Sequence, residues 1–373
     1  MGLTTLVELS NHFGADPDWV LAGGGNTSFK DSDHLYIKAS GTQLATITAD
    51  GFAKMDRAKL AAIWDKSYPT ETAARERQAP ADLMDARMPG EEQKRPSVET
   101  LMHDLFPYAY VLHTHPARIN GLTCGKDGKS RCLEIFPDAL WIPIVNPGYV
   151  LATVIRDAAD TYAKARGEFP SVVFLENHGL VVAGNDPDAT KRAKEGIMET
   201  VKRHLVREPD ISETGASVPG SVIQPISEAF RDASGESWHF EPVTSREVMR
   251  FVESEERFHP VSGPFSPDHV VYSGHKPLFV TKDQVVGGFQ SVLDAYQTSE
   301  DTLPKTVAIE GVGALGCGST QKLARSARQL FIDAVKIATY SESFGGPQFL
   351  PPDQIDFIRG WEVEKYRERV SRE

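Results

Sequence analysis

The sequence predicts an α/β fold in two domains, and three observations support this prediction. Short runs rich in β-branched and aromatic residues alternate with helical patterns in the first half of the chain. The length of 373 residues exceeds the usual size of one domain. Residues 207–226 are rich in Pro, Gly and Ser and are expected to form a linker. We therefore expect one domain over residues 1–210 and a smaller α/β domain over residues 225–373.

In the first domain the expected strands and helices follow one another along the chain. The β-rich runs are LYIKAS (35–40), YAYVLHTH (108–115), LWIPIV (140–145) and SVVFLENHGLVVAG (171–184). The helical stretches are DRAKLAAIWDK (56–66), VETLMHDLF (98–106) and ATKRAKEGIMETVKRHL (189–205). Residues 67–97 are charged, contain prolines and lack apolar periodicity, so we expect a long, partly helical surface connection there.

Composition and charge restrict the classes of function. A formal net charge of -12 argues against nucleic acid or an anionic membrane surface as the main partner. An anionic substrate therefore needs a local positive site. The three cysteines form no C-x-x-C motif, so neither a disulfide framework nor a thiolate zinc site is expected. The amino terminus lacks signal-peptide features and no run approaches the roughly 20 apolar residues of a membrane span, so we expect a cytoplasmic protein.

Three histidines are candidate metal ligands. His113 and His115 lie two residues apart in YVLHTHPA, and alternate residues of a strand share one face. His178 lies at a Glu-Asn-His-Gly break after a predicted strand. Three neutral imidazoles with an open fourth position form a catalytic zinc arrangement, although imidazole ligation also suits iron, copper or nickel. The alternative for each histidine alone is a hydrogen-bonded core or turn residue.

Further stretches offer an acid–base group and a site for anions. Glu99 falls in the first turn of a predicted helix, where its carboxylate either points at the metal or complements the helix dipole. The loop LAGGGNTSFKD (21–31) is rich in N–H groups that can cradle an oxyanion, and IKASGT (37–42) is a second turn of small residues. Neither loop matches a P-loop or a dinucleotide-binding fingerprint.

In this order, the motifs G-N-T-S, S-G, P-S-x-E, H-T-H-P and N-H-G run over residues 24–179, and the chain resembles the class II aldolase/adducin family. The resemblance implies a three-layer α/β/α domain around a largely antiparallel sheet, and a homo-oligomer, with a tetramer favoured. It implies that a divalent metal, usually zinc, is held by His113, His115 and His178. It further implies that Glu99 is the catalytic acid/base.

The resemblance also implies a binding site for the substrate phosphate. The matching positions are Gly25, Asn26, Ser40, Gly41 and Ser97. Val98 departs from the pattern, because those aldolases often have a second phosphate-binding serine there. No residue clearly matches the proton-donating tyrosine of the family, and Tyr149 is a candidate only because it lies between the histidine motifs.

The second domain is similar to the aldolase half of bifunctional rhamnulose-1-phosphate aldolase/alcohol dehydrogenase proteins, on FSPDHVVYSGHKP, GVGALGCGST and residues 344–365. This chain has no dinucleotide fingerprint, so we do not expect a dehydrogenase. A repeat is also suggested, because AIEGVGALGCG (308–318) aligns with FLENHGLVVAG (174–184) and sets Val312 against His178. Strand–Gly turn–helix units often look alike, which is the alternative. A further metal site at His259, His269 and His275 has no recognisable ligand spacing, so surface or core histidines are favoured.

These features together predict an enzyme acting on a small-molecule sugar phosphate. The expected reaction is reversible retro-aldol cleavage of a ketose 1-phosphate or related sugar acid, with the metal stabilising the enediolate and Glu99 moving the proton. An epimerase or a dehydratase on the same scaffold is an alternative. A non-catalytic, adducin-like binding module is another, and the second domain would then be a cover or an interface.

Overall fold

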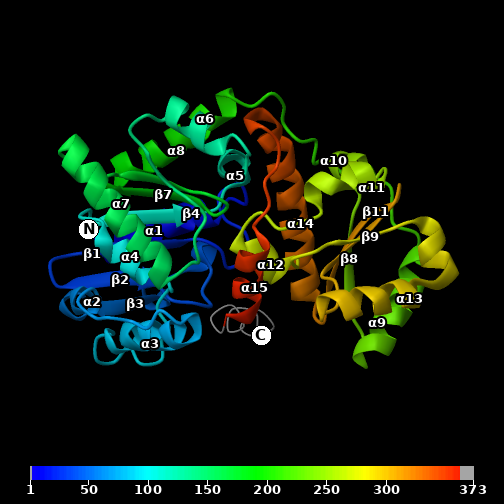
Figure 1. Ribbon diagram of the computed structural model, residues 1–373, viewed down its shortest axis with the longest axis horizontal. Coiled ribbons are helices and arrows are strands. Elements are labelled where there is room, and N and C mark those ends of the chain that lie inside the picture. The colour runs from blue at the N-terminus through cyan, green and yellow to red at the C-terminus, as the bar shows by residue number, and fades with distance from the viewer. Residues whose placement is uncertain (1, 362–373) are drawn as a thin grey trace. The chain divides into compact units, whose positions relative to one another are not determined.

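The computed structural model describes residues 2–361, which fall into two compact units (Figure 1). One unit contains the described residues up to Ile119 and Gly128–His204, and the other contains Asn120–Asp127 and the described residues from Leu205 onward. No change of composition along the sequence marks Asn120–Asp127 as part of the second unit. Within residues 2–361, no helix has both the length and the apolar character needed to cross a membrane.

The first unit is built on a seven-stranded sheet in the order β3-β2-β1-β4-β7-β6-β5. Its strands are β1 (Asn26–Lys30), β2 (His34–Lys38), β3 (Phe52–Asp56), β4 (Tyr110–Thr114), β5 (Leu140–Ile142), β6 (Val172–Leu175) and β7 (Gly179–Gly184). Every neighbouring pair is antiparallel except β5 and β6, which are parallel. The predicted α/β fold with a largely antiparallel central sheet is therefore confirmed.

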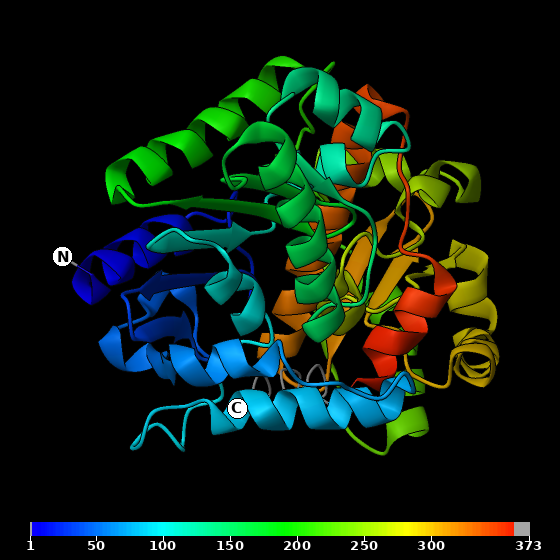
Figure 2. The ribbon, with the colours of Figure 1, turned by 60° about the vertical axis from the view of Figure 1, so that its left-hand side comes forward.

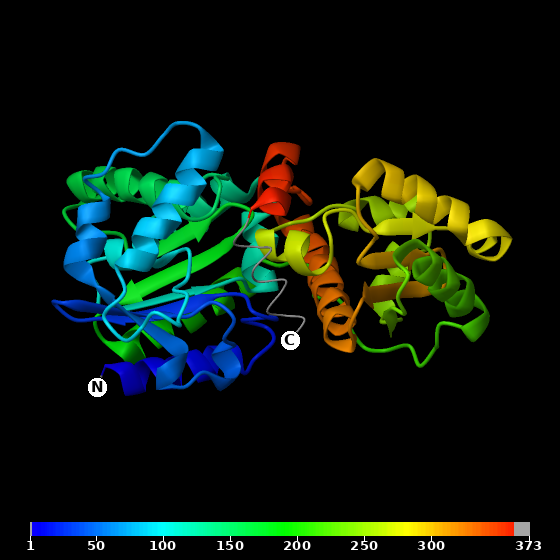
Figure 3. The same cartoon turned by 90° about the horizontal axis from the view of Figure 1, so that it is seen from below.

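Helices cover both faces of this sheet and complete three layers (Figure 3). The helices of the unit are α1 (Leu3–Gly14), α2 (Arg57–Ile63), α3 (Thr72–Asp85), α4 (Thr100–Leu105), α5 (Ala117–Thr123), α6 (Gly128–Ile135), α7 (Tyr149–Arg166) and α8 (Pro187–Arg203). Helices α1 and α8 pack on one face, and α2, α4 and α7 pack on the other. Within the charged stretch 67–97, α3 is the helical part (Figure 2, light blue).

Strand β4 lies at the centre of the sheet and fixes the position of the histidine motif. All five of its residues are buried, and it pairs with β1 on one side and β7 on the other. Strand β1 had no clear sequence signal, because NTSFK lacks apolar alternation. Its pairing with β4 buries Asn26, Thr27 and Ser28, and their side chains need hydrogen-bond partners inside the unit.

The second unit has a four-stranded sheet in the order β8-β11-β10-β9. Its strands are β8 (His239–Val243), β9 (Leu278–Val280), β10 (Thr306–Ile309) and β11 (Gly313–Gly318). Its helices are α9 (Gly220–Ser234), α10 (Arg246–Phe251), α11 (Glu255–Phe258), α12 (Pro267–Tyr272), α13 (Lys282–Glu300), α14 (Gln321–Ser341) and α15 (Pro352–Gly360). Helices α9 and α13 pack on one face of the sheet, and α14 packs on the other.

This second sheet repeats the order and directions of β4-β7-β6-β5. Its parallel pair β9 and β10 is joined through α13 as β5 and β6 are joined through α7, and a hairpin and a helix follow in both units. The hairpin turns also match, since His178 N donates to Leu175 O at 3.1 Å and Val312 N donates to Ile309 O at 3.0 Å. The two units thus share this arrangement of strands and helices, while a duplication stays a prediction.

The matching strands show what stands at the histidine positions in the second unit. In the first unit His113 pairs with Val181, and in the second Pro242 pairs with Leu315, at the equivalent place in its hairpin. His178 corresponds to Val312. Two of the three histidine positions are therefore held by residues without a metal-binding side chain.

Candidate metal centre

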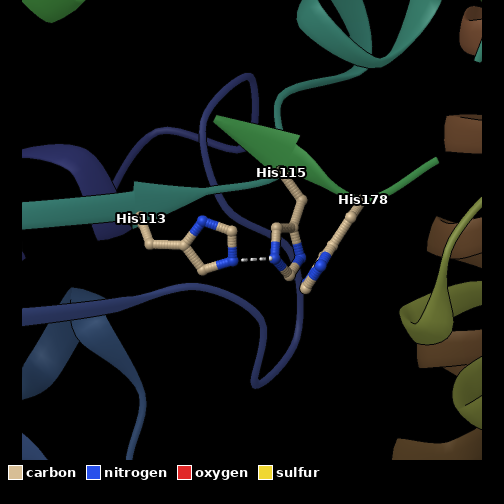
Figure 4. A group of neighbouring side chains, drawn as sticks. All are labelled: His113, His115 and His178. Atoms are coloured by element: carbon tan, nitrogen blue, oxygen red, sulfur yellow. Dashed lines mark hydrogen bonds between the residues drawn. The ribbon is translucent and has the colours of Figure 1, made fainter. Parts of the chain in front are cut away.

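The three histidines of the sequence motifs converge at one end of the first sheet (Figure 4). His113 lies on β4, His115 follows the end of that strand, and His178 lies in the turn between β6 and β7. Because β7 pairs with β4, this turn is placed beside the two strand histidines. The ligating nitrogen atoms of the three rings all lie within 4.8 Å of one another. Three imidazoles at this separation are suited to one divalent metal ion.

The backbone of the turn explains why the motif has the order Asn-His-Gly. Asn177 adopts a left-handed conformation with φ of 52°, which asparagine tolerates better than most residues. A Cβ atom on Gly179 would lie 2.6 Å from the carbonyl oxygen of Thr114 and 2.7 Å from Cδ2 of His115. Only glycine fits there, so the close approach of the turn to β4 depends on this residue.

One ring is oriented by a backbone carbonyl. Nδ1 of His113 lies 3.1 Å from the carbonyl oxygen of Leu180, which can only accept, so Nδ1 carries the proton. The Nε2 atom is then left with its lone pair, and it faces Nε2 of His115 at 2.9 Å. A backbone partner that fixes the ring and its tautomer is typical of metal-binding histidines.

Glu99 directs its carboxylate toward these rings. It occupies the N-cap position of α4, but its side chain makes no capping hydrogen bond. Instead Oε2 lies 3.6 Å from Nε2 of His113, and Oε1 lies 3.5 Å from Nε2 of His178. Within the described part of the chain, the buried Oε1 atom has no hydrogen-bond partner. A cation between the carboxylate and the imidazoles would satisfy it, so the residues present fit a divalent metal.

The surroundings keep the carboxylate ionised and the His113 ring neutral. Burial alone would raise the pKa of Glu99, but the neighbouring His113 and His178 rings and a hydrogen bond from Asn26 lower it to about 2. Burial lowers the pKa of His113 well below its ordinary value, although the charge of Glu99 opposes this. Metal binding requires a neutral imidazole, and a general base requires an ionised carboxylate.

The residues predicted to bind phosphate lie around the start of β1 and the end of β2. Asn26 begins β1 and its Nδ2 atom lies 3.2 Å from Oγ of Ser97. Ser40 donates its backbone N–H to the carbonyl of Arg95, two residues before Ser97. Gly25 and Gly41 have positive φ angles of 65° and 92°. The structure therefore brings this group of residues together.

Lys38 belongs to the same group, although no sequence motif assigned it a role. Its buried Nζ atom donates to the carbonyl oxygens of Gly23 at 2.9 Å and Gly25 at 3.1 Å. The side chain thus brings a positive charge to the glycine-rich loop in a protein of net charge -12. The available signal was a lysine at the end of the apolar run LYIK, where solvent exposure is the usual assumption.

The remaining candidates lie in other surroundings. The ring of Tyr149 lies 4.7 Å from that of Tyr68 and 6.2 Å from that of Trp64, and none of the described contacts joins it to the three histidines. The second-unit histidines have separate partners: His259 is near Phe349, His269 near Ser266 and Asp333, and His275 near Glu300. Over residues 2–361, the group formed by His113, His115 and His178 is the one suited to a metal.

Comparison with known proteins gives several relatives. An uncharacterized oxidoreductase, YuxG, from Bacillus subtilis (strain 168) is 24% identical over 98% of this chain, and the chain spans 58% of that protein's length. The N-terminal class II aldolase domain of a conserved protein from Thermoplasma acidophilum is 27% identical, with a TM-score of 0.45, over 53% of this chain and 91% of that one.

A second solved structure, L-fuculose-1-phosphate aldolase from Thermus thermophilus, is 14% identical, with a TM-score of 0.33, over 54% of this chain and 89% of that one. The family described as the class II aldolase and adducin N-terminal domain matches residues 4–205. That match spans the whole histidine site and more than half of the chain. The chain therefore belongs to the class II aldolase and adducin family.

Proposed function

We propose that the protein is a divalent-metal-dependent lyase that reversibly cleaves a carbon–carbon bond in a ketose 1-phosphate or a related sugar acid. The observation that carries this proposal is the position of Glu99, whose carboxylate faces three convergent imidazoles. A non-catalytic module has no need of a buried, ionised carboxylate at this place, because burying it costs free energy. Family membership supports the proposal without specifying the reaction.

Each part of the site has a role in such a cleavage. His113, His115 and His178 would hold the metal, which supplies Lewis-acid stabilisation of the negative charge that develops at the substrate carbonyl. Glu99 would transfer the proton to or from the carbon next to that carbonyl, a step typically worth about 10²–10⁴-fold in rate. Gly25, Asn26, Ser40, Gly41 and Ser97 would bind the anionic group of the substrate.

Lys38 would support this anion site by holding the glycine-rich loop in place. Its ammonium group holds the glycine-rich loop through two carbonyl oxygens, so the loop N–H groups keep a fixed arrangement. A homo-oligomer, with a tetramer favoured, is part of the proposal, and light scattering on the purified protein measures it directly.

The first experiment is metal analysis of protein purified without chelators or a histidine tag. We expect about one zinc or other divalent ion per chain in the wild type and none in His178→Ala. His12→Ala is the matched control, because His12 is an exposed histidine paired with Glu195, and it should keep the metal. The loaded wild type is then assayed on a panel of ketose 1-phosphates and sugar acids for aldehyde and ketone products.

The outcomes separate the alternatives. Metal lost in His178→Ala together with cleavage products supports the lyase. Metal together with epimerised or dehydrated products replaces the lyase with another reaction of the same site. A wild-type protein that holds no metal after reconstitution overturns the proposal and favours an adducin-like binding module.

A further inference from the structure

Four buried polar side chains form a hydrogen-bonded chain behind the proposed acid/base. Oγ of Ser28 lies 2.7 Å from Nδ1 of His103, and Nε2 of His103 contacts Oδ1 of Asn26. Nδ2 of Asn26 lies 2.5 Å from Oε2 of Glu99. All four side chains are buried, and Ser28 and His103 are completely so. No sequence motif assigned a role to His103.

The regular structure brings these side chains together in pairs. Asn26 and Ser28 alternate along β1 and therefore point to the same face of the sheet. Glu99 and His103 are four residues apart at the start of α4, so they lie on one side of that helix. Thr27 points to the opposite face, where its hydroxyl meets that of Ser10 at 2.7 Å. The two strand side chains thus form hydrogen bonds with the two helix side chains.

The direction of each hydrogen bond follows from the amide group of Asn26. Its nitrogen can only donate and lies against Oε2 of Glu99, and its oxygen can only accept and lies against Nε2 of His103. The ring proton of His103 is therefore on Nε2. Burial lowers the pKa of His103 to about 3, so the ring is neutral and its Nδ1 accepts from the hydroxyl of Ser28.

We propose that His103 is a positioning residue for Glu99, acting through Asn26. His103 fixes the amide of Asn26 in the one orientation that donates to the carboxylate. The other amide hydrogen of Asn26 is directed to Oγ of Ser97, at 3.2 Å. Both amide hydrogens of Asn26 are then engaged within the protein, one of them by the carboxylate of Glu99. The proposal rests on the proposed function only for the catalytic role of Glu99.

Removal of the His103 donor should misorient Glu99. The amide of Asn26 could then rotate by half a turn and present its oxygen to the carboxylate, where two acceptors repel each other. The carboxylate would leave the position it holds beside His113 and His178. Misplacement of a catalytic group by about 1 Å can cost about 10²-fold in rate.

Kinetics on three variants test the positioning role. His103→Leu removes the donor, His103→Gln keeps an N–H that can reach Asn26, and Thr27→Val removes a buried hydrogen bond from the opposite face of β1. We expect kcat to fall about 10²-fold in His103→Leu with KM and metal content unchanged. His103→Gln should recover most of the rate, and Thr27→Val should match the wild type. Equal losses in all three variants, or no loss in His103→Leu, would overturn the proposal.

A measurement without turnover keeps this test separate from the proposed function. Long-range ¹H–¹⁵N spectra of protein labelled at histidine report which ring nitrogen carries the proton. The signals of His103, assigned by their loss in His103→Gln, should show a neutral Nε2–H ring that Thr27→Val leaves unchanged and Asn26→Leu alters. An Nδ1–H ring or an imidazolium at neutral pH would overturn the proposed hydrogen-bond network. If the spectra agree but no substrate is cleaved, the proposed function fails and the hydrogen-bond network stands.

Discussion

Oε1 of Glu99 lies 3.5 Å from Nε2 of His178, so a side chain at the start of α4 meets one in the turn between β6 and β7. The carboxylate is buried and ionised, and it makes no cap hydrogen bond to its own helix. Since the helix start could have used this side chain locally, its direction toward the histidines indicates a role at the site.

Glu99→Gln should lose most of its turnover and leave the metal bound. The amide has nearly the volume of the carboxylate but cannot act as a base at neutral pH, and the three histidines are untouched. We expect a loss of about 10²–10⁴-fold in kcat, measured beside metal content by elemental analysis. Full activity in this variant would show that Glu99 is not the acid/base.

Gly179→Ala should weaken metal binding, because the new Cβ would push against Thr114 O and the ring of His115. Gly313→Ala is the matched control, since Gly313 begins β11 as Gly179 begins β7 and its Cβ would lie 2.8 Å from the carbonyl of Val243. Both variants should lose stability, but only Gly179→Ala should release metal at a lower chelator concentration. Competition with a chromophoric chelator measures this, and equal metal affinity in the two variants would contradict it.

Removal of the metal should lower the melting temperature of the wild type. A ligand that binds only the folded state stabilises it by about 2.7 kcal/mol when present at 100 times its Kd. We expect a chelator to lower the melting temperature of the wild type and to leave that of His178→Ala unchanged. A calorimetric scan of each protein with and without chelator makes the comparison. An identical shift in both proteins would show that the chelator does not act through the three-histidine site.

The sequence alone predicted those site residues whose positions follow from local backbone geometry. The pair His113 and His115 shares a face by strand alternation, and the Asn-His-Gly turn needs glycine because the backbone approaches β4 closely. The motif order then indicated the family, which the match over residues 4–205 confirmed. The alternation of strands and helices was also enough for the fold class.

The remaining features depend on contacts between distant segments. In the sequence His103 is one polar residue in a short helix, and its burial is explained only when β1 lies against α4. Strand β1 itself was missed, because its buried residues are polar and find their hydrogen-bond partners on the distant segments that form α1 and the start of α4. Tyr149 was selected by its place in the sequence, whereas the structure surrounds its ring with other aromatic side chains.

Lys194→Met should stabilise the protein, and more so at pH 6 than at pH 9. Lys194 lies on α8 with its Nζ atom 5.7 Å from the ring centre of Phe13 and 5.4 Å from that of Trp19. Among the described residues, this Nζ has no hydrogen-bond partner. Burial lowers the pKa of Lys194 from 10.5 to about 7, so the aromatic faces offset only part of the cost of burying the charge.

The sign of the pH dependence follows from proton uptake. Between pH 7 and 10.5 the unfolded chain keeps the lysine proton and the folded protein releases it, so this group raises the free energy of unfolding as pH rises across that window. The slope is up to about 1.4 kcal/mol per pH unit. Urea unfolding at pH 6, 7, 8 and 9 should show this slope in the wild type and in Lys202→Met, an exposed control on the same helix. Lys194→Met should lack it, and a slope that persists in that variant would assign the pH dependence to another group.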